Sequence, residues 1–229
     1  HAIRRNMDMV YIVENNGVYG LTKGQYSATA DVGSKKKKGP ANETQPIDLC
    51  ALAINLGCTF VARSFSGSKK QLNSLLKAAM SHKGFALIDV ISPCVTFNNN
   101  DESMRSYGYV KENEVTLHMT DYIPHFNPMV DVEVPEGHFR DITLHDGSTI
   151  RLETISADHD PGDAMGALLA LHGAETGGKH VTGLLYFDAT KPSLAEDLCL
   201  VDEALLDVPN DVLRPDKASL DALNAEFLS

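Results

Sequence analysis

The stretch of this sequence whose residue types are suited to chemistry lies near its start. Asn16-Gly17 follows a continuous apolar run, Met9–Val13, and two further glycines stand at Gly20 and Gly24. Glycines keep side chains away from the backbone, so main-chain amides can approach a phosphate. The side-chain oxygen of Asn16 is a neutral, hard donor of the kind that Mg²⁺ accepts beside phosphate oxygens. The pattern indicates either a magnesium and phosphate site or a simple Asn-Gly turn after a strand.

A second candidate residue follows another apolar run. Cys94 ends a Ser-Pro-Cys string directly after Phe85–Ile91. A cysteine there is either a metal-binding thiolate on a loop or a small core residue. The four cysteines have wide, uneven spacing, which predicts neither a disulfide framework nor a self-contained Cys-x-x-Cys metal site. We therefore expect a reducing, cytoplasmic setting, with Cys50, Cys58 and Cys199 as structural residues.

The order of apolar runs predicts the elements that position these residues. We expect strands over residues 9–13, 59–62, 85–91 and 181–187, and helices over 46–56, 68–81, 163–171, 194–206 and 216–227. Strands alternating with helices predict an α/β fold with a doubly wound parallel sheet. Ligands bind where the carboxyl ends of such strands meet, so strands 9–13 and 85–91 should be neighbours, with Asn16 and Cys94 at one edge. Alternating residues around Asp146-Gly147 predict a peripheral β-hairpin over 139–144 and 148–155.

Composition and charge exclude some classes of function. The chain has 229 residues, of which 43% are hydrophobic and 22% charged, and this is ordinary globular composition. A net charge of -11 argues against nucleic-acid binding. The run Lys35–Lys38 is either a solvated loop or a patch for an anionic partner. No apolar run is long enough to cross a bilayer, so we expect no membrane contact.

The loop also carries a resemblance to a known family. The string NNGVYGLTKGQ, after an apolar strand, is similar to the second half of the thiamine-diphosphate motif in beta subunits of 2-oxoacid:ferredoxin oxidoreductases. The similarity continues, in family order, through FVAR, ISPCVTFN, HDP and TGLLY. It implies a thiamine-diphosphate-binding fold, with its carboxy-terminal half in residues 1–100. Residues 101–229 would be an extension, carrying the hairpin and terminal helices, that packs on the same domain.

The resemblance implies a role for particular residues. Mg²⁺ would be bound by the side chain of Asn16 and the carbonyl of Val18, and Cys94 would be one of four thiolates on a [4Fe-4S] cluster. The residues expected at the cofactor are Asn16, Gly17, Val18, Tyr19, Gly20, Leu21 and Thr22. Leu21, where pyruvate-specific relatives tend to carry Asn, and Lys23 would face the substrate. No side chain is assigned a catalytic role, because the cofactor carries the chemistry.

The implied activity is oxidative decarboxylation of 2-oxoglutarate, or a related 2-oxoacid, to acyl-CoA with electrons passed to ferredoxin. An alpha subunit would contribute contacts to the 2-oxoacid and coenzyme A. Two alternatives remain open, a non-redox thiamine-diphosphate decarboxylase or synthase and an inactive binding subunit. The family's Gly-Asp-Gly segment and its Cys-x-x-Cys stretch are absent. We expect both upstream of His1 and expect the chain alone to be inactive.

One departure from the family pattern and some weaker candidate ligands complete the prediction. The loop reads Ser-Ala-Thr from Ser27 where relatives often have Ser-Pro-Thr, so its contacts remain open. The string Asp-His-Asp around His159 precedes Pro-Gly and predicts a helix start rather than a metal site. His118 and His125 lack a partner at metal-ligand spacing, and we assign them no role.

Overall fold

The computed structural model describes residues 1–35, 39–126, 139–154, 159–201, 203–214 and 216–227. The chain divides into two compact units, residues 1–194 and 195–229, each of which is described by itself. The first unit carries the sheets and both candidate loops. The second contains the helices α6 (Asn210–Leu213) and α7 (Lys217–Phe227), and most of its described apolar side chains are exposed.

A five-stranded sheet forms the centre of the first unit. Its order is β1 (Met9–Asn15), β5 (Phe85–Ile91), β4 (Phe60–Phe65), β10 (His180–Phe187) and β6 (Glu114–Thr116). Strands β1, β5 and β4 are parallel, and β1 pairs with β5 from Met9 opposite Phe85 to Asn15 opposite Ile91. Every residue of β4 and β5 is buried, which explains their nearly continuous apolar sequence. The expected neighbours and the α/β class are confirmed.

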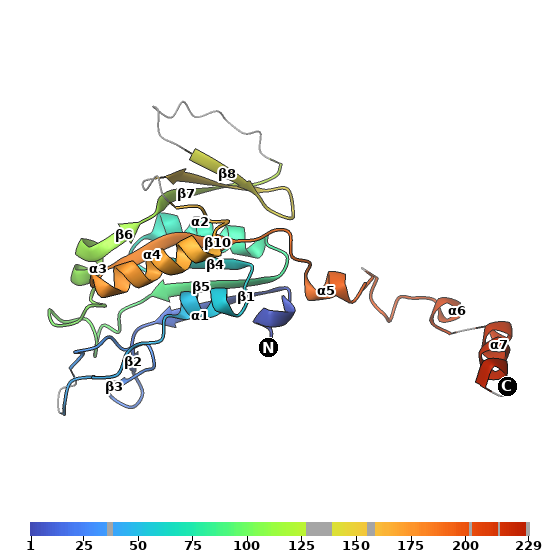
Figure 1. The fold of residues 1–229 in the computed structure, drawn as a ribbon, viewed down its shortest axis with the longest axis horizontal. Coiled ribbons are helices and arrows are strands. Elements are labelled where there is room, and N and C mark those ends of the chain that lie inside the picture. The colour runs from blue at the N-terminus through green and yellow to red at the C-terminus, as the bar shows by residue number, and fades with distance from the viewer. Residues whose placement is uncertain (36–38, 127–138, 155–158, 202, 215, 228–229) are drawn as a thin grey trace. The chain divides into compact units, whose positions relative to one another are not determined.

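Helices cover both faces of this sheet (Figure 1). On one face α1 (Leu49–Asn55) and α4 (Ala164–Thr176) share a core cluster with β4, β5 and β10. On the other face α2 (Lys69–Met80) packs its buried side against β4 and β5. The side chain of Asp48 caps α1 by accepting from the amide of Ala51, and Asp163 caps α4 in the same way through Met165. The expected start at Asp163, after Pro-Gly, is confirmed.

A second, antiparallel sheet lies against the outer side of α2 (Figure 1). Its order is β7 (His118–Ile123), β9 (Thr149–Thr154) and β8 (Phe139–Thr143). Strands β8 and β9 are the expected hairpin, and β7 is an addition to it. Leu144, Ile150 and Leu152 bury their side chains in the same cluster as Leu75 and Ile88, so this sheet contributes to the core.

The structure differs from the expected fold in two respects. The central sheet is mixed, because β10 is antiparallel to β4 while remaining parallel to β6. Element order alone does not determine the end from which a connection enters a strand. The helix expected over 194–206 is wrong: α5 (Leu194–Asp197) ends early, and Cys199 follows with φ +51°. The leucines beyond it are exposed, so helical spacing there has no core to face.

The remaining elements are short, and apart from the first, which lies where residues 1–6 are expected to end a helix, the sequence did not indicate them. They are the 3-10 helix η1 (Ile3–Arg5), the two-residue strands β2 (Val18–Tyr19) and β3 (Gln25–Tyr26), and α3 (Tyr107–Asn113). The proposed division at residue 100 stays a prediction, although β6 and β10 share one sheet with strands from before that residue. None of the described helices is long and apolar enough to cross a membrane.

Two of the buried histidines have strongly lowered pKa values. His118 is 1% exposed, and its Nε2 lies 3.1 Å from both the amide nitrogen and the carbonyl oxygen of Leu184. Burial, with a smaller contribution from His159, lowers the pKa of His118 to about 4. Burial and the neighbouring His145 lower the pKa of His82 to about 4 as well. Both side chains are therefore neutral in the folded chain above about pH 4.

These pKa values predict how stability depends on pH. Between pH 6.5 and 4 the unfolded chain binds protons that the folded histidines do not, so the free energy of unfolding should fall as pH falls through that window. We expect each histidine to account for a loss of about 1 kcal/mol between pH 7.5 and 5.5. Urea unfolding of His118→Gln should show a smaller pH dependence, and His172→Gln, on an exposed position of α4, should not. Equal pH dependence in all three proteins would contradict the burial argument.

Candidate functional site

Both candidate loops leave the same edge of the central sheet. The first loop follows Asn15 at the end of β1, and the second follows Ile91 at the end of β5. Asn15 and Ile91 are paired at the ends of β1 and β5, and the amide of Ser92 donates to the carbonyl of Asn15 at 3.1 Å. The expectation that Asn16 and Cys94 lie at one edge is therefore confirmed. Parallel pairing brings together two loops that are separated by 78 positions in the chain, 94 minus 16.

The first loop has a shape that depends on its glycines and on Asn16. The Asn16 Oδ1 accepts a hydrogen bond from the amide of Val18 at 2.9 Å, which orients the side-chain amide. Gly17 has φ +71°, and a methyl on it would lie 3.0 Å from Arg105 Cδ and 3.1 Å from Asn98 Nδ2. Strands β2 and β3 then close a small hairpin. Only glycine fits position 17 without strain.

The tip of that hairpin carries the two residues expected to face the substrate. Leu21 is 99% exposed, so nothing in the described structure covers it. Lys23 has φ +66° and its amide donates to the carbonyl of Gly20 at 3.1 Å. A hollow of about 220 Å³ lies beside the hairpin, with Lys23, Lys35 and Phe97 among its lining residues. A methyl added at Gly20 would meet no atom within 4 Å, so a side chain is not sterically excluded there in the described chain.

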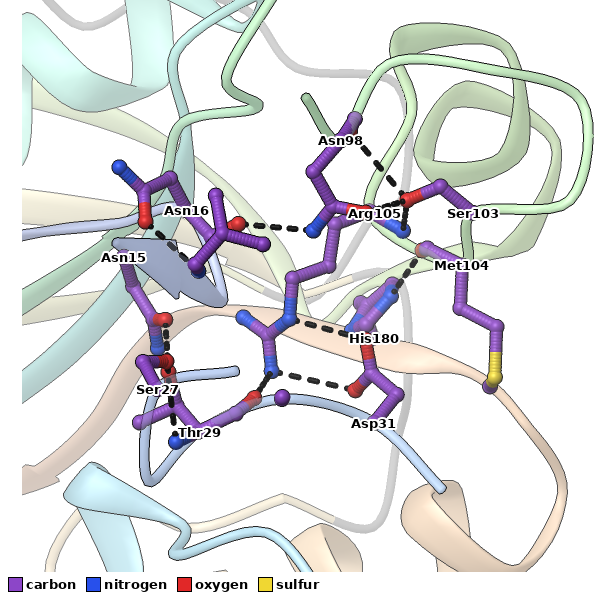
Figure 2. A network of polar contacts seen from close by, with 12 residues as sticks. Asn15, Asn16, Ser27, Thr29, Asp31, Asn98, Ser103, Met104, Arg105 and His180 are labelled. Atoms are coloured by element: carbon purple, nitrogen blue, oxygen red, sulfur yellow. Dashed lines mark hydrogen bonds and ion pairs between the residues drawn. The ribbon is translucent and has the colours of Figure 1, made fainter. Parts of the chain in front are cut away.

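The second loop holds the first through side-chain contacts (Figure 2). Asn98 Nδ2 donates to the carbonyl of Asn16 at 2.8 Å, and its Oδ1 accepts from Ser103 Oγ at 2.6 Å. Arg105 contacts both carboxylate oxygens of Asp31, at 2.9 and 3.1 Å, and donates to the carbonyl of Thr29. The two loops are therefore one packed assembly.

A buried polar network supports the base of the first loop. Asp89, on β5, accepts from Asn15 Nδ2 and from Arg63 Nε, both at 2.9 Å. Arg63 also donates to Asp48, the cap of α1, at 2.9 Å. Burial raises the pKa of Asp48, but the Arg63 charge and several hydrogen bonds outweigh it and lower the pKa overall. Thr29 Oγ1 donates to Asn15 Oδ1, which ties the loop to this network.

Sequence reasoning missed most of this network. Arg63 and Asp89 are charged residues inside otherwise apolar strands, and that interruption was the signal available for them. They line a polar cavity of about 70 Å³ at the sheet edge, together with Asn15, Asp48 and His180. Asn98 ends the family string ISPCVTFN but was assigned no role, and Arg105 gave no signal, because polar residues after a strand are usual in loops.

The four cysteines have different surroundings. Cys94 is partly buried on a loop, and its carbonyl accepts from the amides of Phe97 and Asn98. Cys50 and Cys58 are fully buried and donate to backbone carbonyls. Burial raises the pKa of Cys58 to about 11 and that of Cys50 well above its usual range. These two remain thiols in the core, whereas Cys199 is exposed.

Comparison with known proteins defines the class. Residues 1–90, which contain β1, β4, β5 and the first candidate loop, match the family model for the thiamine pyrophosphate enzyme, C-terminal TPP binding domain. The three parallel strands of the sheet and the Asn16 loop therefore lie in the part of the chain that is similar to this family.

Within that class, the resemblance to 2-oxoacid:ferredoxin oxidoreductase beta subunits is confirmed. The chain is 45% identical over 130 residues to that subunit from Sulfolobus sp. and 52% identical over 99 residues to that of Saccharolobus solfataricus. It is 37% identical over 110 residues to the 2-oxoglutarate oxidoreductase subunit KorB of Mycobacterium tuberculosis. These matches include 56%, 43% and 47% of this chain but only 40%, 32% and 30% of the relatives.

A solved structure agrees with these matches. The 2-oxoglutarate:ferredoxin oxidoreductase from Magnetococcus marinus, with 2-oxoglutarate, coenzyme A and succinyl-CoA bound, aligns with a TM-score of 0.64 and 28% identity. The alignment covers 97% of this chain and 60% of that one. The chain therefore spans less than two thirds of the length of the proteins it matches.

The geometry of Gly17 yields a prediction with a matched control. Gly17→Ala adds a methyl where φ is positive and where Arg105 and Asn98 are already close. We expect the free energy of unfolding to fall by about 1 to 2 kcal/mol. Gly20→Ala meets open space and should change stability by less than about 0.5 kcal/mol. Urea unfolding of the two variants measures the difference, and equal stabilities would contradict the packing described for Gly17.

Proposed function

We propose that this chain provides the thiamine-diphosphate-binding part of a 2-oxoacid:ferredoxin oxidoreductase beta subunit. The reaction is oxidative decarboxylation of 2-oxoglutarate, or a related 2-oxoacid, to acyl-CoA with electrons passed to ferredoxin, in a cytoplasmic setting. The observation that carries the proposal is the pairing of β1 with β5, because it puts the Asn16 loop and Cys94 at one sheet edge. A redox thiamine enzyme needs both a cofactor site and an electron acceptor close to it.

The first loop has the donor chemistry for Mg²⁺. Asn16 Oδ1 and the Val18 carbonyl are neutral, hard oxygens, and magnesium takes few protein ligands together with phosphate oxygens and water. The hydrogen bond from the Val18 amide fixes the Asn16 side chain before a metal binds. Residues 16–22 would then orient the diphosphate. When bound, thiamine diphosphate supplies the carbon nucleophile and the electron sink.

Cys94 is the proposed ligand of a [4Fe-4S] cluster. Four thiolates hold such a cluster, and Cys50 and Cys58 are unsuitable because both are buried thiols with raised pKa values. The described residues contain no group of three or more His, Cys, Asp or Glu side chains that could hold a metal ion. The other three thiolates are therefore proposed to come from polypeptide outside the described residues.

The hairpin tip is the proposed substrate contact. Lys23 carries a positive charge that suits the distal carboxylate of 2-oxoglutarate, and Leu21 in place of a polar amide leaves room for a longer substrate. Because Leu21 is 99% exposed, we propose that an alpha subunit covers it and completes the contacts to the 2-oxoacid and coenzyme A. A non-redox thiamine enzyme would have no use for a thiolate at Cys94.

The role of Asn16 is tested by two substitutions in the complex of full-length subunits. Asn16→Ala removes the proposed oxygen ligand, so magnesium-dependent binding of thiamine diphosphate should weaken at least about tenfold. Asn16→Asp keeps an oxygen at the same place and should retain most of the affinity. Calorimetric titration with and without Mg²⁺ measures both. Unchanged affinity in the alanine variant would leave Asn16 as a turn residue only.

The role of Cys94 is tested by its effect on the cluster. Serine is a poorer iron ligand, so Cys94→Ser should lose most of the broad iron-sulfur absorbance and most ferredoxin reduction. Thiamine diphosphate content and some 2-oxoacid decarboxylation should remain, since these need only the organic cofactor. Cys199→Ser is the control, because its thiol is exposed in the second unit. Loss of absorbance in the control with none in Cys94→Ser would remove Cys94 from the ligand set.

A further inference from the structure

One residue joins the two candidate loops directly. Asn98 is 8% exposed, and its side chain contacts both Asn16 and Ser103 (Figure 2). Its side-chain amide donates to the Asn16 carbonyl at 2.8 Å, and its main-chain amide donates to the Cys94 carbonyl at 2.8 Å. Asn98 therefore contacts both the proposed metal ligand and the proposed cluster ligand.

The orientation of Asn98 is fixed from the other side. Its Oδ1 accepts from Ser103 Oγ at 2.6 Å, and that hydroxyl accepts from the amide of Arg105 at 3.1 Å. The Arg105 guanidinium, which is nearly buried, makes an ion pair with Asp31 and donates to the Thr29 carbonyl at 2.7 Å. A charged, two-pronged contact of this kind is stronger than a neutral hydrogen bond. The segment after Cys94 thus contacts the first loop at two places, near Asn16 and near Asp31.

Close packing leaves this assembly little freedom. Gly17 lies against both Asn98 and Arg105, and Thr29 connects the far end of the first loop to Asn15 at the end of β1. The position of Asn16 is therefore set by the second loop as well as by its own strand. A displacement of about 1 Å at a site of this kind is enough to impair function.

We propose that Asn98 and Arg105 are positioning residues that hold the Asn16 loop at a fixed place relative to Cys94 before any cofactor binds. This role rests on the proposed function, in which Asn16 binds Mg²⁺ and Cys94 binds the iron-sulfur cluster. The contacts themselves, however, can be tested in the 229-residue chain without cofactor. Neither residue is proposed to touch the reacting atoms.

Two neighbouring asparagines provide a matched pair of variants. Asn98→Asp keeps the acceptor for Ser103 but replaces the donor to the Asn16 carbonyl with a negative oxygen. Asn99→Asp makes the same change of charge one position away, where the Asn99 Oδ1 only accepts from the amide of Tyr107. The pair separates the contact between the loops from the effect of an added charge.

The first measurement is hydrogen exchange in the whole chain. Amides of residues 16–27 should exchange at least about tenfold faster in Asn98→Asp than in the parent chain, because a hydrogen bond that closes the loop is lost. Asn99→Asp should match the parent within about twofold. Equal exchange in the two variants would overturn the positioning role. If Asn98→Asp melts far below the parent, Ser103→Ala replaces it, and unchanged exchange there has the same meaning.

The second measurement addresses function in the complex with the alpha subunit. The dissociation constant for thiamine diphosphate with Mg²⁺ should rise about tenfold in Asn98→Asp and remain within about twofold in Asn99→Asp. Arg105→Lys, which loses the two-pronged contact with Asp31, should behave like Asn98→Asp. Faster exchange without weaker cofactor binding would show that the hydrogen bond between Asn98 and Asn16 exists, but it would overturn the positioning role. If Asn16→Ala also binds thiamine diphosphate normally, the proposal that Asn16 is a magnesium ligand fails instead. The hydrogen-exchange result does not depend on that proposal.

Discussion

A buried carboxylate is the constraint on which the candidate site depends. Asp89 is 1% exposed in the middle strand of the parallel part of the sheet, where an unpaired charge would be very costly. Arg63 neutralises it and Asn15 donates to it, so β4, β1 and β5 are aligned by one side chain. Removal of one partner from such a buried pair costs about 3 to 5 kcal/mol. The direction of the Asn15 side chain, and with it the start of the loop that carries Asn16, follows from this requirement.

The same requirement extends to the helix on one face. Asp48 caps α1 and also binds Arg63, so the start of the helix is fixed relative to the strands. The second loop adds a further layer through Asn98 and Arg105. The loop that carries Asn16 is thus held by two sets of contacts. One is the buried network at the end of β1, and the other is the segment after Cys94. Ligand-binding loops are often mobile, whereas this one is secured through side chains at both its ends.

The sequence predicted the parts of the fold that depend on continuous burial. Strands β4 and β5 are apolar runs because both of their faces are covered. The order of the runs predicted that Asn16 and Cys94 lie at one edge. The direction of β10 was not predictable, because it depends on the path of the intervening chain around the second sheet. Helical spacing after Leu194 was misleading, since no core lies opposite those leucines in the second unit.

The proposed ligands could be predicted from the sequence, whereas the residues that support them could not. Asn16 and Cys94 were indicated by residue type, position after a strand and family resemblance. The roles of Asn98 and Arg105 depend on contacts between segments far apart in sequence, which no local pattern reports. Burial also separates the cysteines, since Cys50 and Cys58 face the core whereas Cys94 lies on a loop, and sequence spacing alone ranks them equally.

Strand β1 has one further consequence. It forms an edge of the central sheet, and Met9, Tyr11 and Ile12 are each about half exposed there. An apolar hollow of about 330 Å³ adjoins it, lined mainly by residues of η1, α1 and β1 with Phe85 and Leu87 of β5. An apolar edge of this length is a template for strand addition and does not distinguish a proper partner from another copy of the same chain. Purified alone at high concentration, the chain is therefore prone to self-association, and its solubility depends on what occupies that edge.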